Sequence, residues 1–492
     1  MGVMVILLAF AARLWNLGGP SLWLDEAMML ARAHVDWSTA VVGKVSTDLA
    51  PPLYPVLLHA WSVLGVQDAV VRYSSVVLGV LAVAVMTRLD GLSVSASEQM
   101  QARGQRGEDW LAALIFAIAP TQIYHAQQVN VYALVALLSA LIFIVTQRAV
   151  QGRRRAWLAL AVLAVASAYT YYGLAFLFVG MLGWLAAAYL HEYLKLLRPR
   201  PYPKPPAIGV GLLVTAAAIL PVLPMALERS AGTVAAWAGQ FAVLNDWVGL
   251  KIFLVGLVAE GIVAPLFPYA QVPTWLALGL TAVFAIGAWR RPAWFTWGWL
   301  VPLGLAYLAS GFGVYPFSQR HVLFVAPIVY ALLAAGLLSL RPAWLRWLAI
   351  ASLAVILVTG WTAPGFDVPW QANVAQEEQK PVLQALAQER RVDDAIYVTY
   401  GAAAAAAHYQ ELGLLQGDAY LHQGWYAGRA GYQADQALGV AGSRPRLWVL
   451  ISHAPPGEEE QLAEGLAHRG AHLVQRIAAP GAAALLFDLR AP

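Results

Sequence analysis

Residues 2–34, GVMVILLAFAARLWNLGGPSLWLDEAMMLARAH, decide the class of fold. Their first half is an apolar run, and helices of about 20 mainly apolar residues cross the hydrocarbon of a bilayer. No basic segment of the kind that opens a signal peptide precedes it, so we interpret residues 2–17 as a membrane span. The second half carries an acidic pair, Asp25 and Glu26, next to Trp23. A span followed at once by carboxylates indicates a membrane protein with polar groups at one surface of the bilayer.

The composition of the whole chain agrees with this interpretation. Of the 492 residues, 60% are apolar and 12% are charged, whereas a soluble protein carries about 25% charged residues. So little charge would not keep a chain of this size in solution. Cysteine is absent, which excludes disulfides and thiolate metal sites. The bases sit where membrane topology would place them, so the net charge of +4 does not indicate nucleic-acid binding.

Charge divides the chain near Trp361. Residues 1–360 hold 22 bases and 13 acids, and residues 361–492 hold 9 bases and 14 acids at a higher density. We therefore expect an all-α polytopic membrane domain over residues 1–360 and a soluble α/β domain over residues 361–492.

Apolar runs predict about eleven transmembrane helices, because a helix satisfies its own backbone in lipid. They lie near residues 2–17, 70–88, 110–124, 129–147, 156–172, 173–190, 207–224, 273–289, 293–311, 321–340 and 343–360. With the N-terminus inside, 15 bases fall in inner loops and 6 in outer loops, as the positive-inside rule requires. This topology places long loops at 18–69 and 225–272 outside the plasma membrane and makes the C-terminal domain extracytoplasmic. Residues 247–264 are expected to lie on the outer leaflet without crossing.

The C-terminal part has a pattern of alternating helices and strands. Helices are predicted near 375–390, 402–412 and 456–469, and strands near 395–400, 447–452, 472–477 and 483–489. It contains no glycine-rich phosphate loop, paired histidines or nucleophile elbow, so we expect no second catalytic centre there.

The acidic pair allows two interpretations. Asp25 could cap an amphipathic helix running to about His34, with Glu26 favouring the helix dipole. Alternatively, a carboxylate held at the lipid boundary could take a proton from an acceptor hydroxyl. Neighbouring helix positions diverge by about 100°, so the two side chains are not expected to do the same job. In the second interpretation Asp25 is the base, and Glu26 supports it or ligates a metal.

The other candidate polar residues lie in the first outer loop or at predicted outer span ends, and each has a structural and a functional interpretation. Arg72 opens the second span and could either snorkel or bind phosphate. Arg13, inside the first span, is costly unless paired, and we interpret it as structural. Histidines at span ends are either interfacial hydrogen-bonding groups or ligands. The candidates are Asp48, Tyr54, Arg72, Tyr124, His125, Gln128, Arg320 and His321.

The order of these motifs resembles the C-type (GT-C) integral-membrane glycosyltransferases, and within them the branch of protein O-mannosyltransferases, aminoarabinose transferases and their bacterial relatives. The resemblance covers residues 1–340 and rests on the acidic pair, Asp48-Leu49-Ala50-Pro51-Pro52-Leu53, Arg72, the segment 119–132, and Phe317 to His321 with Pro327. Two positions depart from the family pattern. Ala50 stands where relatives commonly have His, and Gln127-Gln128-Val129-Asn130 stands where many have Gln-Glu-Ala-Arg.

The resemblance implies a cell-envelope enzyme that transfers a hexose or pentose, with inversion, from a polyprenyl-phosphate donor to an acceptor on the outer face. Asp25 would be the general base with Glu26 beside it, and Arg320, then Arg72, would bind the donor phosphate. The cavity lining would be Asp48, Tyr54, Tyr124, His125, Gln128 and His321. A divalent metal is compatible with this chemistry, although the scattered histidines supply no clear ligand set. The acceptor, whether protein, lipid or glycan, is left open.

The main alternative is a transporter or flippase of lipid-linked saccharide. Transporters usually place ionisable groups near the midplane and contain internal repeats. In this sequence the ionisable residues gather at outer span ends and no repeat between the halves is detected. These features favour the transferase.

Overall fold

The computed structural model describes residues 2–34, 51–88, 109–150, 153–194, 247–268, 271–291, 293–362, 377–415, 419–421 and 430–490. The chain divides into two compact units. Unit 1 comprises Met1–Trp15, Trp37–Leu57 and Tyr73–Asn373, and unit 2 comprises Asn16–Asp36, Leu58–Arg72 and Val374–Pro492. Unit 2 thus combines parts of the first predicted outer loop with the C-terminal region. The division at residue 361 stays a prediction about where a soluble domain begins.

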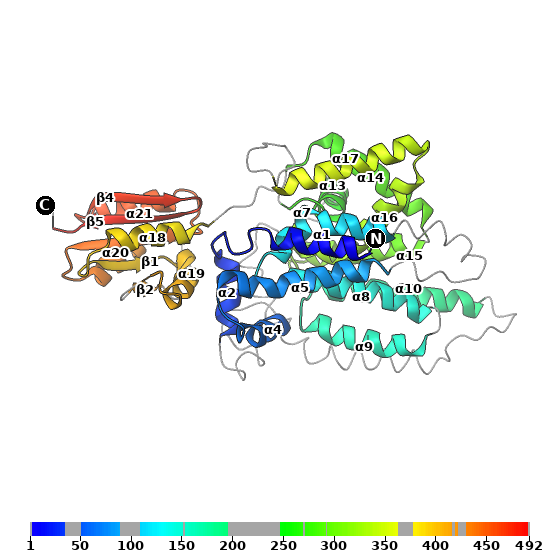
Figure 1. Ribbon diagram of the computed structural model, residues 1–492, viewed down its shortest axis with the longest axis horizontal. Coiled ribbons are helices and arrows are strands. Elements are labelled where there is room, and N and C mark those ends of the chain that lie inside the picture. Colours follow the sequence, from blue (N-terminus) through cyan, green and yellow to red (C-terminus); the bar gives the residue numbers. More distant parts are fainter. Residues whose placement is uncertain are drawn as a thin grey trace. The chain divides into compact units, whose positions relative to one another are not determined.

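Unit 1 is helical (Figure 1). Its helices are α1 (Gly2–Leu14), the greater part of α5 (Asp68–Met86), a helix over Asp109–Ile118, α7 (Pro120–Ala126), α8 (Tyr132–Val150), α9 (Arg154–Ala168), α10 (Leu174–Leu194), α13 (Trp247–Val258), α14 (Thr274–Arg290), α15 (Ala293–Gly311), α16 (Ala326–Ser339) and α17 (Ala343–Thr362). A π-turn, η2 (Ala259–Val263), follows α13, and a 3-10 helix, η3 (Gln319–Val325), precedes α16. Helix α4 (Leu53–Ser62) contributes to both units.

Four helices in the described part of the chain are long and apolar enough to cross a membrane. They are Asp68–Met86, Tyr132–Ala149, Gln319–Ser339 and Ala343–Trp361. Shorter apolar helices occur at most of the other predicted spans, while the span near 207–224 lies outside the described residues. The expected span 110–124 is broken after Ile118, because Pro120 cannot donate a backbone hydrogen bond and begins the separate helix α7.

The buried helix α16 is fixed closely against α14. A Cβ placed on Gly336 would lie 1.9 Å from the carbonyl oxygen of Val283, and one on Gly287 would lie 1.8 Å from that of Leu332. Only glycine permits this approach, as is usual where membrane helices pack tightly. Helix η3 runs directly into α16, so the side chains of η3 are held at the end of a fixed element.

Arg13 is fully buried near the end of α1. Its Nη1 donates to the carbonyls of Ala9 and Ala117 at 3.0 and 2.9 Å, and Nη2 donates to that of Phe116 at 3.3 Å. Backbone carbonyls therefore accept from a charge that would be costly alone, in agreement with its structural interpretation.

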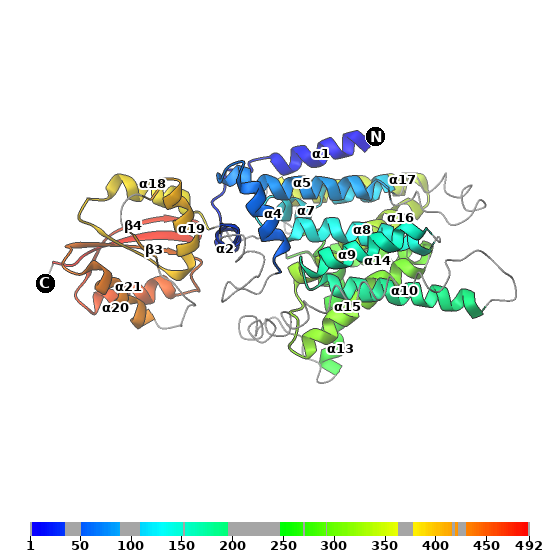
Figure 2. The ribbon, with the colours of Figure 1, turned by 90° about the horizontal axis from the view of Figure 1, so that it is seen from below.

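The C-terminal part of unit 2 is a five-stranded mixed sheet with helices on both faces. The strands are β1 (Ala395–Val398), β2 (Ala419–Leu421), β3 (Arg446–Ser452), β4 (His472–Ala479) and β5 (Ala482–Asp488), in the order β2-β1-β3-β5-β4. Strands β1, β2 and β3 are parallel, while β5 is antiparallel to β3 and β4. Figure 2 shows α18 (Gln379–Glu389) and α19 (Tyr400–Glu411) on one side of the sheet, and α20 (Ala430–Ala441) and α21 (Glu458–Ala467) on the other.

Side chains alternate between the two faces of this sheet, as strand geometry requires. Tyr397, Val449 and Phe487 face a core that includes Ala434 and Ala437 of α20. Strand β2 and helix α20 were not predicted from the sequence, which named no element at residues 419–421 or 430–441. Helix α20 buries small alanines, so its sequence lacks the large apolar stripe on which the prediction relied.

Candidate functional site

Asp25 and Glu26 lie in the first turn of α2 (Leu24–Ala33). The predicted helix is confirmed, with His34 as its C-cap. Because successive helix positions diverge by about 100°, the two carboxylates have different surroundings. Glu26 is 1% exposed, whereas Asp25 is partly exposed. Of the pair, Asp25 is the carboxylate that solvent reaches.

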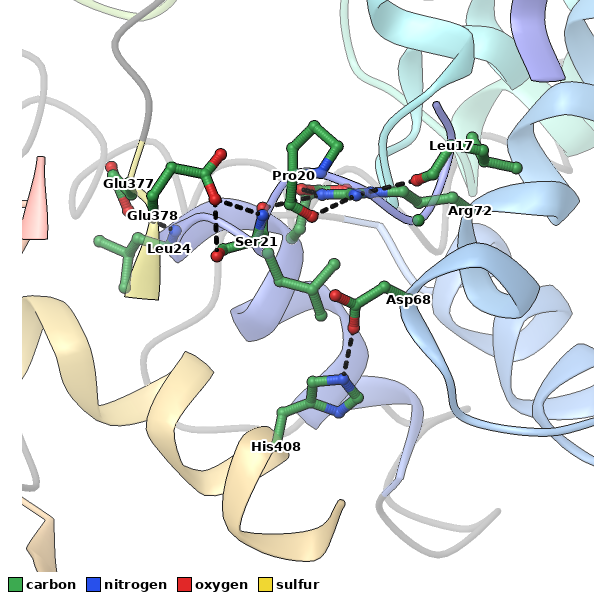
Figure 3. Close-up of polar contacts among 12 residues, drawn as sticks. Leu17, Pro20, Ser21, Leu24, Asp68, Arg72, Glu377, Glu378 and His408 are labelled. Carbon is green, nitrogen blue, oxygen red and sulfur yellow. Dashed lines mark hydrogen bonds and ion pairs between the residues drawn. The ribbon is translucent and has the colours of Figure 1, made fainter. Parts of the chain in front are cut away.

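Glu26 pairs with the buried guanidinium of Arg72. Arg72 Nε and Nη2 donate to Glu26 Oε1 and Oε2 at 2.8 and 2.6 Å. The other donors bind carbonyls of the segment before α2: Nη1 reaches Leu17 and Pro20 at 3.0 and 2.8 Å, and Nη2 reaches Ser21 at 2.9 Å (Figure 3). An arginine has five N–H donors, and each of the five has a protein acceptor here.

This pairing bears on two predicted roles. A phosphate at Arg72 would have to replace a carboxylate or carbonyl that already accepts from the guanidinium. A metal at Glu26 would have to approach oxygens that both accept from a cation. Phosphate binding by Arg72 and metal ligation by Glu26 stay predictions, while the contacts favour a structural clamp. The described residues contain no group of three or more His, Asp or Glu side chains arranged to hold a metal ion.

Asp68, at the start of α5, accepts hydrogen bonds from three side chains of the C-terminal region. His408 Nε2 lies 2.9 Å from Oδ1, and Tyr409 Oη and Lys380 Nζ lie 3.2 and 3.0 Å from Oδ2. The Tyr409 hydroxyl also accepts the Leu22 amide at 2.6 Å. Burial, followed by the Asp68 carboxylate, raises the pKa of Tyr409 above its ordinary value, so its hydroxyl remains a donor.

Two consecutive glutamates hold the segment that leads into α2. Glu378 Oε2 accepts from the amide and the hydroxyl of Ser21, at 3.1 and 2.9 Å. Glu377 Oε2 accepts from the Leu24 amide at 2.9 Å (Figure 3). The segment before Asp25 is therefore fixed by Arg72 and by residues that follow it by more than 350 positions.

Unit 1 contains a second polar cluster, around Arg320 in η3. Arg320 interacts electrostatically with His125 of α7, with His321 and with Tyr171. The Tyr315 hydroxyl lies 2.7 Å from the His321 carbonyl and 3.1 Å from the Tyr171 hydroxyl. Ser318 Oγ lies 2.7 Å from His321 Nδ1. The Arg320 cation thus lies close enough to two imidazoles and one tyrosine hydroxyl to interact with them electrostatically, and a guanidinium in a polar cluster can bind an anionic group.

Two predicted lining residues in this unit have unsatisfied polar atoms. His125 is 4% exposed, and its ring packs on Tyr124 and Tyr132 with centroids 5.0 and 4.6 Å away. Within the described part of the chain, His125 Nδ1 and Gln128 Oε1 have no hydrogen-bond partner. Buried polar atoms usually have partners, so each such atom needs an explanation, and a bound molecule is one.

Of the remaining predicted lining residues, one is described and has a hydrogen-bond partner, and one lies outside the described residues. Tyr54 is buried, and its hydroxyl lies 2.8 Å from Ser75 Oγ, which suits a structural role. Asp48 lies outside the described residues. Sequence reasoning missed Glu377, Glu378 and His408, because acids at the start of an amphipathic helix and a lone helical His look like solvated side chains.

No protein-family model matches the sequence, and no curated protein matches it. Among solved structures, the chain is similar to ArnT, the aminoarabinose transferase, from Cupriavidus metallidurans bound to undecaprenyl phosphate, with a TM-score of 0.53, 11% identity and coverage of 98% of this chain and 97% of that one. It is also similar to the Archaeoglobus fulgidus oligosaccharyltransferase in complex with zinc and sulfate, with a TM-score of 0.50, 12% identity and coverage of 98% and 72%. The fold is that of the GT-C membrane glycosyltransferases.

The likeness runs over almost the whole chain, so the GT-C architecture includes the C-terminal mixed sheet as well as the helices. Together with its apolar helices, it identifies the chain as a multi-pass membrane protein. The resemblance inferred from the motifs is confirmed at the level of fold.

Proposed function

We propose that the chain is a glycosyltransferase that moves a sugar from a polyprenyl-phosphate donor to an acceptor on the outer face of the membrane. The observation that carries this proposal is the full-length GT-C fold, shared with a transferase that was crystallised with undecaprenyl phosphate. The contacts of unit 1 and unit 2 supply residues of the types that such a reaction needs.

In this proposal Asp25 is the general base. Its carboxylate takes the proton of the acceptor hydroxyl, and the acceptor oxygen attacks the anomeric carbon. The bond between that carbon and the phosphate oxygen breaks, and the phosphate leaves with the electron pair, which gives inversion. The partial exposure of Asp25 supports this role, since a base must reach the proton that it takes.

Arg320 is the proposed phosphate ligand. A guanidinium matches phosphate oxygens and stabilises the charge that develops on the leaving group. The unsatisfied atoms of His125 and Gln128 support a place for the sugar hydroxyls beside it. Arg72 is the second proposed phosphate ligand, and its donors would have to leave the acceptors that they bind here.

The test uses purified full-length protein in lipid nanodiscs, radiolabelled polyprenyl-phosphate sugars and a membrane extract as acceptor source. We expect Asp25→Asn to abolish transfer, while Glu389→Gln, an exposed acid of the C-terminal region, keeps it. Arg320→Ala should raise the apparent KM for donor, whereas Arg290→Ala, an exposed base at the end of α14, should not.

Two results would overturn the proposal. Equal transfer by wild type and Asp25→Asn would remove Asp25 as the base. In sealed proteoliposomes, movement of labelled donor between leaflets without transfer would establish the flippase instead.

A further inference from the structure

The first turn of α2 is capped by a residue from the other end of the chain. Trp23 at the N-cap position makes no side-chain hydrogen bond to the helix. Glu377 Oε2 accepts the Leu24 amide at 2.9 Å, one residue before Asp25. A carboxylate at this position satisfies an amide that the helix leaves unpaired, and its charge complements the helix dipole. The cap that the local sequence lacks is thus supplied by Glu377.

Glu377 is itself held in a fixed direction. Its side chain is 6% exposed, and its Oε1 lies 2.5 Å from Nδ1 of His453. His453 follows the last residue of β3 and has a φ of 51°, which lies in the left-handed region. Non-glycine residues in this region are uncommon and persist where the surroundings impose them, often at functional sites. The backbone at the end of β3 is therefore strained in the conformation that places the imidazole on Glu377.

These residues lie where a parallel sheet usually carries its ligand. The connection that leaves β1 through α19 leads to β2, while the connection that leaves β3 through α21 leads to β4 on the other side. In open α/β sheets, ligands bind at the carboxyl ends of strands whose connections diverge in this way. Tyr400 follows β1 at this edge, and burial together with the Asp25 carboxylate raises its pKa. The first turn of α2, with Asp25, accordingly lies near this edge of the sheet.

We infer that Glu377 is a positioning residue for Asp25. By fixing the Leu24 amide, and by being fixed in turn by His453, it sets the direction from which the Asp25 carboxylate meets the acceptor hydroxyl. The inference rests on the proposed function, in which Asp25 is the base. It assigns to the C-terminal sheet a direct part in turnover, through the backbone of α2 and not through contact with the substrates.

Such a role predicts a particular kinetic pattern. Misplacing a reacting group by about 1 Å can cost on the order of 10²-fold in rate. The proposed function assigns the donor phosphate to Arg320 and not to α2, so the donor KM should stay unchanged while kcat falls. A residue that only held the fold together would lower the fraction of folded enzyme, which also lowers the apparent kcat at unchanged KM, so kcat is calculated per folded protein, quantified by size-exclusion chromatography.

The experiment compares Glu377→Ala with Glu377→Gln in full-length protein in nanodiscs. The glutamine keeps an oxygen that can accept the Leu24 amide, so we expect kcat near that of wild type. The alanine should lower kcat by roughly 10- to 100-fold at unchanged donor KM. Glu459→Ala is the matched control, since it removes the pair of Glu459 with Arg476 on α21 and β4 and should leave kcat unchanged. The inference is overturned if Glu377→Ala behaves like Glu459→Ala, or if the glutamine is as slow as the alanine.

A second pair of variants tests the part of His453. Asn tolerates a positive φ and can donate to Glu377, whereas Gly accepts the same backbone conformation and donates nothing from its side chain. We expect His453→Asn to keep most of the activity and His453→Gly to lose several-fold in kcat, with donor KM unchanged in both. Equal kcat in the two variants would show that the His453 side chain does not position Asp25 through Glu377. Both variants can adopt the left-handed backbone conformation, so their comparison isolates the side-chain hydrogen bond to Glu377.

Hydrogen–deuterium exchange separates this inference from the proposed function. In Glu377→Ala, the amides of residues 24–27 should exchange faster than in wild type, and in Glu459→Ala they should not. If wild type transfers no sugar, the proposed function fails whatever the exchange shows. If wild type transfers sugar but neither exchange nor kcat changes in Glu377→Ala, the positioning role alone fails.

Discussion

Replacing Arg72 distinguishes a structural clamp from a phosphate ligand. The Arg72→Ala substitution removes five donors and leaves the Glu26 carboxylate, which is 1% exposed, without its counter-charge. Breaking a buried ion pair from one side costs about 3–5 kcal/mol. Units of 150–250 residues shift by about 2–4 °C per kcal/mol, so we expect the Tm to fall by roughly 6–20 °C.

A double-mutant cycle measures the coupling energy between Glu26 and Arg72. Glu26→Leu alone leaves Arg72 on three carbonyls and should be destabilising for the same reason. The double variant Glu26→Leu/Arg72→Leu removes both charges, and a buried pair replaced by apolar side chains is often tolerated. We expect the double variant to be more stable than the sum of the single losses, by about 2 kcal/mol.

The assay is thermal unfolding of purified full-length protein in detergent, together with donor binding measured well below each Tm. A clamp predicts a lowered Tm, positive coupling and an unchanged donor Kd in the folded protein. If Arg72→Ala keeps the wild-type Tm and loses donor affinity, then Arg72 binds the phosphate and the argument from its occupied donors is wrong. Additive single losses would also refute it, since independent residues show no coupling energy.

Two further predictions concern buried polar groups. The raised pKa of Tyr409 means that the folded state favours the neutral hydroxyl, so its contribution to stability is complete below pH 10.0 and is lost as the pH rises further. Tyr409→Phe should have a lower Tm than wild type at pH 8 and a shallower fall in Tm between pH 9.5 and 11. A fall in Tm as steep as that of wild type would contradict this. His125→Phe should keep the wild-type Tm and raise the donor KM by about tenfold, because Nδ1 has no partner in the described part of the chain. By contrast, His408→Phe should lower the Tm, because it removes a hydrogen-bond donor from Asp68. A lowered Tm with an unchanged donor KM in His125→Phe would show that His125 has a structural role.

The apolar runs predict most of the unit 1 helices that the structure describes, because each apolar run must satisfy its own backbone. Helix α2 was also predicted closely, since an acidic first turn precedes its amphipathic residues. The prediction fails where burial depends on small side chains. Ala434 and Ala437 pack α20 on the sheet, yet alanines in a glycine-containing segment give almost no periodic contrast.

The candidate site was predicted only as far as local patterns reach. Asp25 and Glu26 stand out as neighbours, and their divergence on a helix follows from geometry alone. The pairing of Glu26 with Arg72 joins residues 46 positions apart, and the Leu24 amide meets a carboxylate 353 positions away. Nothing in one sequence distinguishes these contacts from those of any other acid or base. Arg72 was therefore expected to snorkel or to bind phosphate, and a buried ion pair between Arg72 and Glu26 was not considered.

The length of α2 explains why such distant contacts matter for the proposed base. The helix has 10 residues, and isolated helices shorter than about 12–15 residues are marginal in water. Its conformation must therefore be imposed by the residues around it. Glu26 fixes the buried side of the first turn through Arg72, and Glu377 fixes its end through the Leu24 amide. Asp25, between them, has its backbone set from two directions while its carboxylate stays partly exposed, which is the arrangement that a general base on a short helix requires.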